Sequence, residues 1–157
     1  MFYQKKLIAK YLTIFVGGNH EVSQLLCENY NGGFLCDKIY FMGYSNIIDI
    51  IKNDKIYTIG GISGIYDKYW YRKPYKSPPI IGKKVKSEHR IREYEVAKLY
   101  MFNNYIDIFI SHDWPKYIWA QDGLDELLQK KPFFEKDIIN DNFANIGTAI
   151  LLNKLEP

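Results

Sequence analysis

The chain has 157 residues, of which 47% are hydrophobic and 25% are charged, and its formal net charge at pH 7 is +3. This balance is typical of a globular domain and argues against a disordered chain. No apolar run approaches the roughly 20 residues that cross a bilayer, so no membrane-spanning helix is expected. The mild excess of positive charge permits an anionic partner without requiring one.

The first informative stretch is an apolar strand that ends in a polar loop. Leu12–Val16 is rich in β-branched and aromatic residues, which predicts a short buried strand. The pair Gly17-Gly18 then allows a sharp turn, and Asn19-His20-Glu21 follows. Because open α/β sheets bind ligands at the carboxyl ends of their strands, this loop is the first candidate site.

The next part of the chain alternates short apolar runs with turn residues. No helical pattern separates the runs after residue 30, which favours a mixed or antiparallel part of a sheet. The expected elements are a helix over Glu21–Glu28, a turn at Tyr30–Phe34, paired strands over Lys38–Tyr44 and Asn46–Ile51, a hairpin turn at Asn53-Asp54 and a strand over Lys55–Ile59.

Gly60–Gly82 has no regular hydrophobic period and is predicted to be an irregular loop that extends to about residue 86. Loops of this length inside a compact domain are commonly functional or disordered. Aromatic faces can stack on bases and cationic side chains can contact phosphates. An exposed loop of biased composition remains the alternative. The side chains of both kinds are Tyr66, Lys68, Tyr69, Trp70, Tyr71, Arg72, Lys73 and Lys76.

The last third of the chain predicts helices around one more strand. The spacing over Ser87–Asn103 predicts an amphipathic helix with Glu88, Arg92, Glu95 and Lys98 on its outward face. Ile106–Ile110 predicts a strand that runs into Ser111-His112-Asp113, a second polar loop with a histidine. The remaining expected elements are a helix over Asp122–Gln129, a helical turn over Pro132–Ile139 and a helix over Asn145–Leu155.

Two of these motifs resemble signatures of the calcineurin-like metallophosphoesterases. They are Gly-Asn-His-Glu at residues 18–21 and Ser-His-Asp-Trp-Pro at residues 111–115. With Gly60–Ile65, Tyr71-Arg72-Lys73 and Ser77-Pro78-Pro79, the set is similar to the lariat debranching family. The resemblance implies an α/β fold, a two-sheet sandwich flanked by helices. It also implies metal-dependent hydrolysis of the 2′-5′ phosphodiester at intron branch points, in the nucleus.

The same resemblance suggests a role for each site residue. It implies that Asn19 and His112 ligate a divalent ion (Mn, Fe or Zn) and that His20 protonates the departing 2′-oxygen. It makes Glu21 and Asp113 candidates for orienting the imidazoles. Branched RNA would be the partner. The residues that would bind it are Tyr66, Tyr71, Arg72, Lys73 and Arg92.

Several family motifs are absent from the sequence. It contains no Gly-Asp, His-x-His, Cys-x-His or Asp-x-His. Residues 1–157 are therefore expected to form a partial catalytic domain, incomplete at both ends and inactive alone, as a gene model cut short or a divided gene would produce. Two alternatives stay open: another calcineurin-like phosphoesterase, or a non-catalytic RNA-binding remnant.

Overall fold

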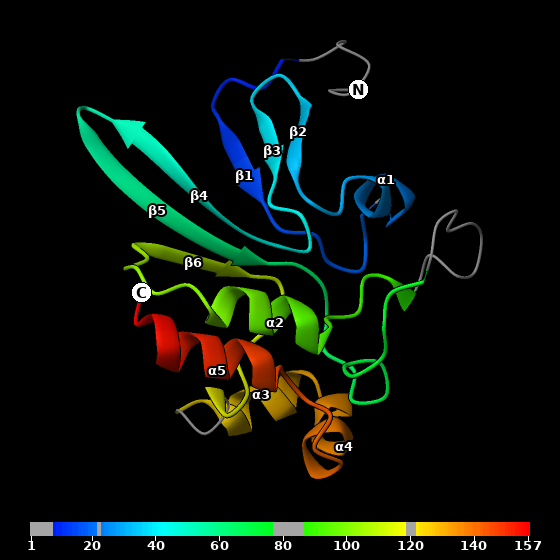
Figure 1. Ribbon diagram of the computed structural model, residues 1–157. Helices are drawn as coiled ribbons and strands as arrows, with labels where there is room; N and C mark the ends of the chain where they lie inside the picture. Colours follow the sequence, from blue (N-terminus) through cyan, green and yellow to red (C-terminus); the bar gives the residue numbers. More distant parts are fainter. Residues whose placement is uncertain (1–7, 22, 77–86, 119–121) are drawn as a thin grey trace.

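The computed structural model describes residues 8–21, 23–76, 87–118 and 122–157, which form two three-stranded sheets and five helices (Figure 1). The predicted α/β class is confirmed. One sheet contains β1 (Thr13–Phe15), β2 (Gly33–Cys36) and β3 (Ile39–Phe41), and the other contains β4 (Ser45–Lys52), β5 (Lys55–Ile62) and β6 (Ile108–Ser111). The helices are α1 (Ser23–Glu28), α2 (Glu93–Tyr100), α3 (Leu124–Lys130), α4 (Phe133–Ile139) and α5 (Ile146–Leu155).

The second sheet is built on the predicted hairpin. β4 and β5 pair antiparallel over their full lengths, from Ser45 opposite Ile62 to Lys52 opposite Lys55. Asn53 and Asp54 form the turn with φ angles of 52° and 59°, the left-handed pair that a two-residue hairpin prefers. β6 then adds parallel to β5, so Ser111 lies opposite Ile62. The chain segments that follow β5 and β6 therefore leave the sheet at the same edge.

The first sheet differs from the prediction. Lys38–Tyr44 was expected to pair with Asn46–Ile51, but β3 pairs with β1 in parallel and with β2 antiparallel. The change of sheet occurs at Gly43, where φ is 76° and a Cβ would lie 2.6 Å from the amide nitrogen of Gly32. Only glycine accommodates both the left-handed backbone and this close approach. β2 was not predicted, because its four residues show no alternation.

The predicted irregular loop begins later than expected. β5 continues through Gly60 and Gly61 to Ile62. A Cβ at Gly60 would lie 3.0 Å from the side chains of Ile106 and Phe109, so the glycine lets neighbouring groups pack directly on the strand. Glycine in this strand marks close packing rather than a turn. Residues 77–86 of the predicted loop lie outside the described residues.

The predicted helix over Ser87–Asn103 is shorter than expected, since α2 begins only at Glu93. The residues before it run beside the segment that follows β5: the Ile65 amide donates to the carbonyl of His89 at 3.0 Å and the Ile91 amide to that of Ile65 at 3.0 Å. The expectation that Glu88, Arg92 and Glu95 face outward is wrong, because all three are buried.

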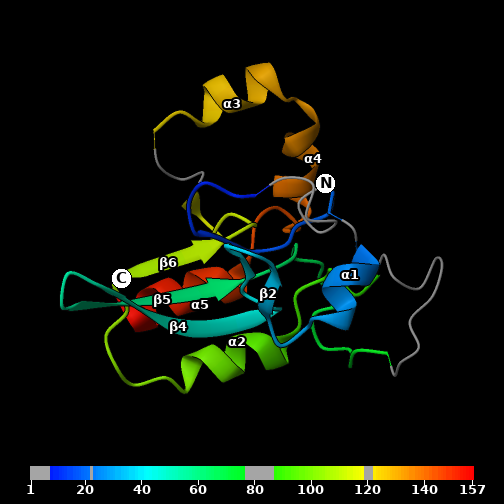
Figure 2. The ribbon, with the colours of Figure 1, turned by 90° about the horizontal axis from the view of Figure 1, so that it is seen from above.

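The core lies between the second sheet and helices α2 and α5, which Figure 2 shows beside that sheet. A Cβ at Gly147 of α5 would lie 2.5 Å from Val96 Cγ2 of α2, so glycine allows the two helices to approach closely. None of the helices in the described part of the chain is long and apolar enough to span a membrane. The core residues are Ile62, Ile91, Val96, Leu99, Ile106, Leu151 and Leu155.

Candidate active site

The two polar loops singled out in the sequence meet at one place in the structure. Gly18 follows β1 and His112 follows β6, and the imidazole of His112 lies against the backbone of Gly18. A Cβ at residue 18 would lie 2.1 Å from both Cδ2 and Nε2 of that ring. Real contacts are never this short, so only glycine allows the two loops to approach in this way. The structure thus places the Asn19 loop beside the His112 loop, although their strands belong to different sheets.

A serine joins the two sheets next to this contact. The Ser63 hydroxyl, just after β5, accepts a hydrogen bond from the Gly17 amide at 2.9 Å and donates to the carbonyl of Gly43. The Gly64 amide donates to the carbonyl of Gly17 at 2.7 Å. Because Ser63 is buried, these bonds are shielded from water. Ser63 belongs to the Gly60–Ile65 motif, but no pattern in the sequence indicates that its hydroxyl connects the two sheets.

Glu21 closes the first loop. Its Oε2 accepts a hydrogen bond from the Gly18 amide at 2.6 Å, which folds residues 18–21 into a tight turn. The side chains of Asn19 and His20 are exposed on this turn, and His112 is exposed as well. The predicted ligands and the predicted proton donor are therefore accessible from solvent.

Asp113 connects the site to the segment that follows β5. Its Oδ2 accepts a hydrogen bond from the backbone amide of Tyr66 at 2.7 Å. Burial raises the pKa of the Asp113 carboxyl, while the Tyr66 amide and the nearby His112 charge act in the opposite direction. The observed bond thus gives Asp113 a structural role. Its predicted role in orienting an imidazole, and that of Glu21, remain predictions.

The donor atoms fit part of a metal site. The Asn19 carboxamide oxygen and the His112 imidazole nitrogen suit Mn²⁺, Fe²⁺ or Zn²⁺. Zinc-type sites take three or more protein ligands. In the part of the chain that the structure describes, no three His, Cys, Asp or Glu side chains cluster as such a set. Asn19 and His112 can therefore contribute two ligands to a site that needs others.

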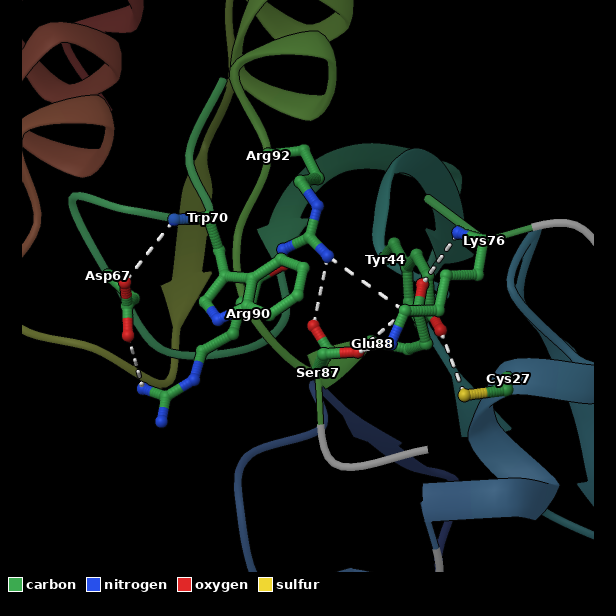
Figure 3. Close-up of polar contacts among 9 residues, drawn as sticks. All are labelled: Cys27, Tyr44, Asp67, Trp70, Lys76, Ser87, Glu88, Arg90 and Arg92. Carbon is green, nitrogen blue, oxygen red and sulfur yellow. Dashed lines mark hydrogen bonds and ion pairs between the residues drawn. The ribbon is translucent and has the colours of Figure 1, made fainter. Parts of the chain in front are cut away.

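Arg92 lies inside the protein rather than on the predicted outward face. Its Nη1 donates to the carbonyl of Arg90 at 2.8 Å and its Nη2 to the carbonyl of Ser87 at 3.0 Å (Figure 3). Its guanidinium carbon lies 5.3 Å from the Trp70 ring centroid and 4.8 Å from that of Tyr75. The side chain holds this segment together, so a direct contact with RNA would require the segment to open.

The partner of Arg92 is Glu88, which is also buried, although the helical pattern predicted it on the outward face. Nη2 of Arg92 lies 4.0 Å from Oε1 of Glu88, at a spacing of four residues. The Lys76 amide and the Ser87 hydroxyl also donate to the Glu88 carboxylate, at 3.3 Å and 2.9 Å. The i, i+4 pairing of opposite charges was visible in the sequence, but its burial depends on Trp70 and Tyr75, which come from another part of the chain.

The other predicted RNA-binding side chains have mixed environments. Arg72 is accessible to a partner, since 84% of its side chain is exposed and its ion pair with Glu93 is long, at 3.8 Å. Lys73 Nζ lies 2.9 Å from the centroid of the Tyr69 ring. This cation–π interaction makes the Lys73 charge less available to a partner. Tyr66 and Tyr71 pack with ring centroids 5.5 Å apart, and burial raises the pKa of Tyr71 to about 12. Their role in RNA binding stays a prediction.

Comparison with known proteins gives consistent results. The chain is 37% identical over 157 residues to a lariat debranching enzyme of Arabidopsis thaliana, covering 99% of this chain and 37% of the relative. It is 39% identical to a lariat debranching enzyme of Schizosaccharomyces pombe and 36% identical to one of Homo sapiens, covering 99% of this chain and 33% and 28% of those relatives. The chain thus spans about a third of the length of the curated relatives it matches. No family model matches it.

Proposed function

Because the chain is related over almost its whole length to lariat debranching enzymes, we propose that it serves the hydrolysis of the 2′-5′ phosphodiester in branched RNA. The observation that carries this proposal is the contact of Gly18 with His112. It brings together the two motifs on which the resemblance rests, from two sheets and from distant positions in the chain. The assignment as a hydrolase follows from the same proposal.

The chemistry we propose divides between a divalent metal ion and His20. Asn19 and His112 would hold the ion together with further ligands, and a bound ion would offset negative charge on the phosphoryl oxygens. His20 is exposed on the turn next to Asn19. An imidazole can donate a proton near neutral pH, which suits a departing 2′-oxygen. The product of the proposed hydrolysis would be a linear RNA, which would give the protein a role in RNA processing. We therefore also propose a nuclear location.

The first experiment tests whether these residues form a working site. We expect the 157-residue chain with Mn²⁺ or Fe²⁺ to leave branched RNA intact, because two ligands hold such an ion weakly. A chimera in which this chain replaces the matching segment of the Schizosaccharomyces pombe relative should cut the branch and spare a linear 3′-5′ RNA. Cleavage of both RNAs at similar rates would favour a general phosphodiesterase.

Two substitutions in the chimera separate the proposed roles. His112→Ala should lower bound metal and activity together, because a ligand is removed. His20→Ala should lower activity by about 10²–10⁴-fold, the usual contribution of general acid catalysis, with bound metal largely retained. Metal analysis of the purified variants measures the difference. Equal metal loss in both variants would show that His20 is a ligand instead of a proton donor.

A further inference from the structure

A cavity of about 320 Å³ has His112 in its lining and extends beyond it, to aromatic side chains that the proposed chemistry does not use. On one side of the cavity lie the segments that follow β5 and β6, and on the other lie α4 and the segment that joins it to α5. Its aromatic walls come from Tyr66, Trp114, Phe134 and Phe143. Small-molecule sites commonly have volumes of about 300–1,000 Å³ with mostly apolar and aromatic walls, so this cavity has the size and lining of a binding pocket. We call it the Trp114 pocket.

The aromatic rings of the pocket support one another and leave one surface open. Phe143 is only 8% exposed and packs edge-on against Trp114, with ring centroids 6.1 Å apart at 86°. It also contacts Phe134, with the ring centroids 4.7 Å apart. Trp114 nevertheless remains 49% exposed. A large indole that is held from one side and open on another can serve as a platform on which a flat ring stacks.

The backbone around Trp114 is held in place by hydrogen bonds to the buried residue Asn145. The Asn145 amide donates to the carbonyl of Trp114 at 2.7 Å, and the Lys116 amide donates to the carbonyl of Asn145 at 2.9 Å. Asn145 itself is fully buried and caps α5 by accepting from the Gly147 amide at 2.8 Å. The platform is therefore preformed, and little ordering is needed when a ligand binds.

The charges around the pocket select a neutral occupant. Two carboxylates, Asp113 and Asp137, line it together with one cation, Lys131. Lys131 Nζ lies 5.6 Å from the centroid of the Phe134 ring, so it is partly engaged at the wall. Away from His112, a phosphate beside Asp113 and Asp137 would meet a net negative charge, whereas a nucleobase would present an apolar face to the rings and N–H donors to the carboxylates.

We propose that the Trp114 pocket binds a nucleobase of the branched RNA, stacked on Trp114, next to the phosphate held at His112. This inference rests on the proposed function for the identity of the ligand, but the stacking itself can be measured without any catalysis.

The test uses binding of free nucleosides to the 157-residue chain. Adenosine, guanosine, cytidine and uridine are titrated by NMR, with AMP and ribose 5-phosphate alongside. At least one nucleoside should bind, AMP should bind no more than about threefold tighter than adenosine, and ribose 5-phosphate should not shift the Trp114 indole signal. Trp114→Leu should weaken binding on the order of 10-fold, because stacking on one aromatic ring contributes that much. Trp114→Phe should restore most of it.

Phe134 offers a matched control. Phe134→Leu should weaken nucleoside binding far more than Phe133→Leu, because Phe133 is 62% exposed and contacts Phe134, with ring centroids 4.4 Å apart, without lining the pocket. Unchanged affinity in both Trp114→Leu and Phe134→Leu, binding of ribose 5-phosphate as tight as that of AMP, or binding of none of the four nucleosides would each overturn the proposal. A chimera that fails to cut branched RNA while nucleosides still bind would contradict the proposed function and leave the pocket standing.

Discussion

At the scale of single residues, the candidate site requires glycine at position 18, because any side chain there would collide with the His112 ring. The backbone at Gly18 lies directly against the His112 ring. The position of His112, a proposed metal ligand, therefore depends on Gly18, which is not itself a ligand. Glycines in such loops are often attributed to the turn alone. Here close approach is the stronger requirement, since φ of Gly18 is not in the left-handed region.

We predict that Gly18→Ala displaces the His112 ring. The ring is the exposed end of a flexible side chain, so it can swing away, and the free energy of unfolding should change by less than about 1 kcal/mol. Metal affinity of the chimera should fall by about 10–100-fold, the usual effect of disturbing the support of a ligand. Isothermal titration with Mn²⁺ and urea unfolding measure the two quantities.

A double-variant cycle provides the control. If Gly18→Ala acts through the ring, it should have no further effect on metal affinity when His112→Ala is already present. A further loss in that background would mean that Gly18 acts on Asn19 instead.

At the scale of elements, the predictions that succeeded depended on local signals. The Asn53-Asp54 turn, the flanking strands and α5 follow from a few neighbouring residues each. The predictions that failed depended on distant packing. Gly60 and Gly61 looked like loop residues because nothing nearby in the sequence reveals the side chains packed on β5. The predicted pairing of Lys38–Tyr44 was wrong for the same reason. Its actual partners, β1 and β2, are determined by tertiary packing and not by neighbouring residues.

The candidate site could be predicted further than the sheet that holds it. The motifs around Asn19 and His112 named the loops that meet, because their order of residue types is distinctive. Neither motif revealed the bonds that support them, such as Ser63 to Gly17 and Asp113 to the Tyr66 amide. Those bonds depend on where backbone groups from separate strands arrive, which a single sequence does not encode locally.

Asn145 is the element-scale position that we expect to matter most for stability. Its side chain accepts from the Gly147 amide at 2.8 Å and donates to the Thr148 hydroxyl at 2.6 Å, all in the interior. Asn145→Ala should lower the free energy of unfolding by about 1–3 kcal/mol, because it removes the helix cap and leaves buried polar groups unpaired. Urea denaturation followed by circular dichroism measures the change.

Asn140→Ala is the matched control for this change. Asn140 is exposed at the end of α4, where its side chain faces water, so its substitution should change the free energy of unfolding by no more than about 0.5 kcal/mol. Equal losses in the two variants would show that the cap of α5 is not the cause.

At the scale of the whole molecule, positive charge is divided between the surface and the interior. The side chain of Arg72 is 84% exposed, whereas that of Arg92 is 2% exposed and lies between aromatic rings and Glu88. Sequence reasoning grouped the two arginines as RNA contacts. In the structure, the charge of Arg72 is available to a partner, whereas Arg92 stabilises the segment before α2.

We predict that these arginines respond differently to substitution. Arg72→Ala with Lys73→Ala should weaken binding of single-stranded RNA and reduce its salt slope by about 0.7 for each phosphate that is no longer neutralised. Stability should change little. Arg92→Ala should instead lower the free energy of unfolding by about 3–5 kcal/mol, because the buried Glu88 loses its ion pair with Arg92 and keeps only neutral hydrogen-bond donors. Salt titrations of RNA binding and urea unfolding of the isolated chain separate the two effects.

The reverse result would correct this division. An unchanged salt slope in the Arg72 and Lys73 variant would place the RNA-binding surface elsewhere on the molecule. An unchanged unfolding free energy in Arg92→Ala would show that the interior tolerates its removal.

The hydrogen bond between the Tyr66 amide and Asp113 allows the motion of the His112 loop to be followed by hydrogen–deuterium exchange. An amide proton exchanges with deuterium only when its hydrogen bond opens, and this one bridges the loop of His112 and the segment after β5. Any ligand that steadies the His112 loop slows this opening. The deuterium uptake of a single backbone amide, that of Tyr66, therefore reports how often the loop separates from the segment that supports it.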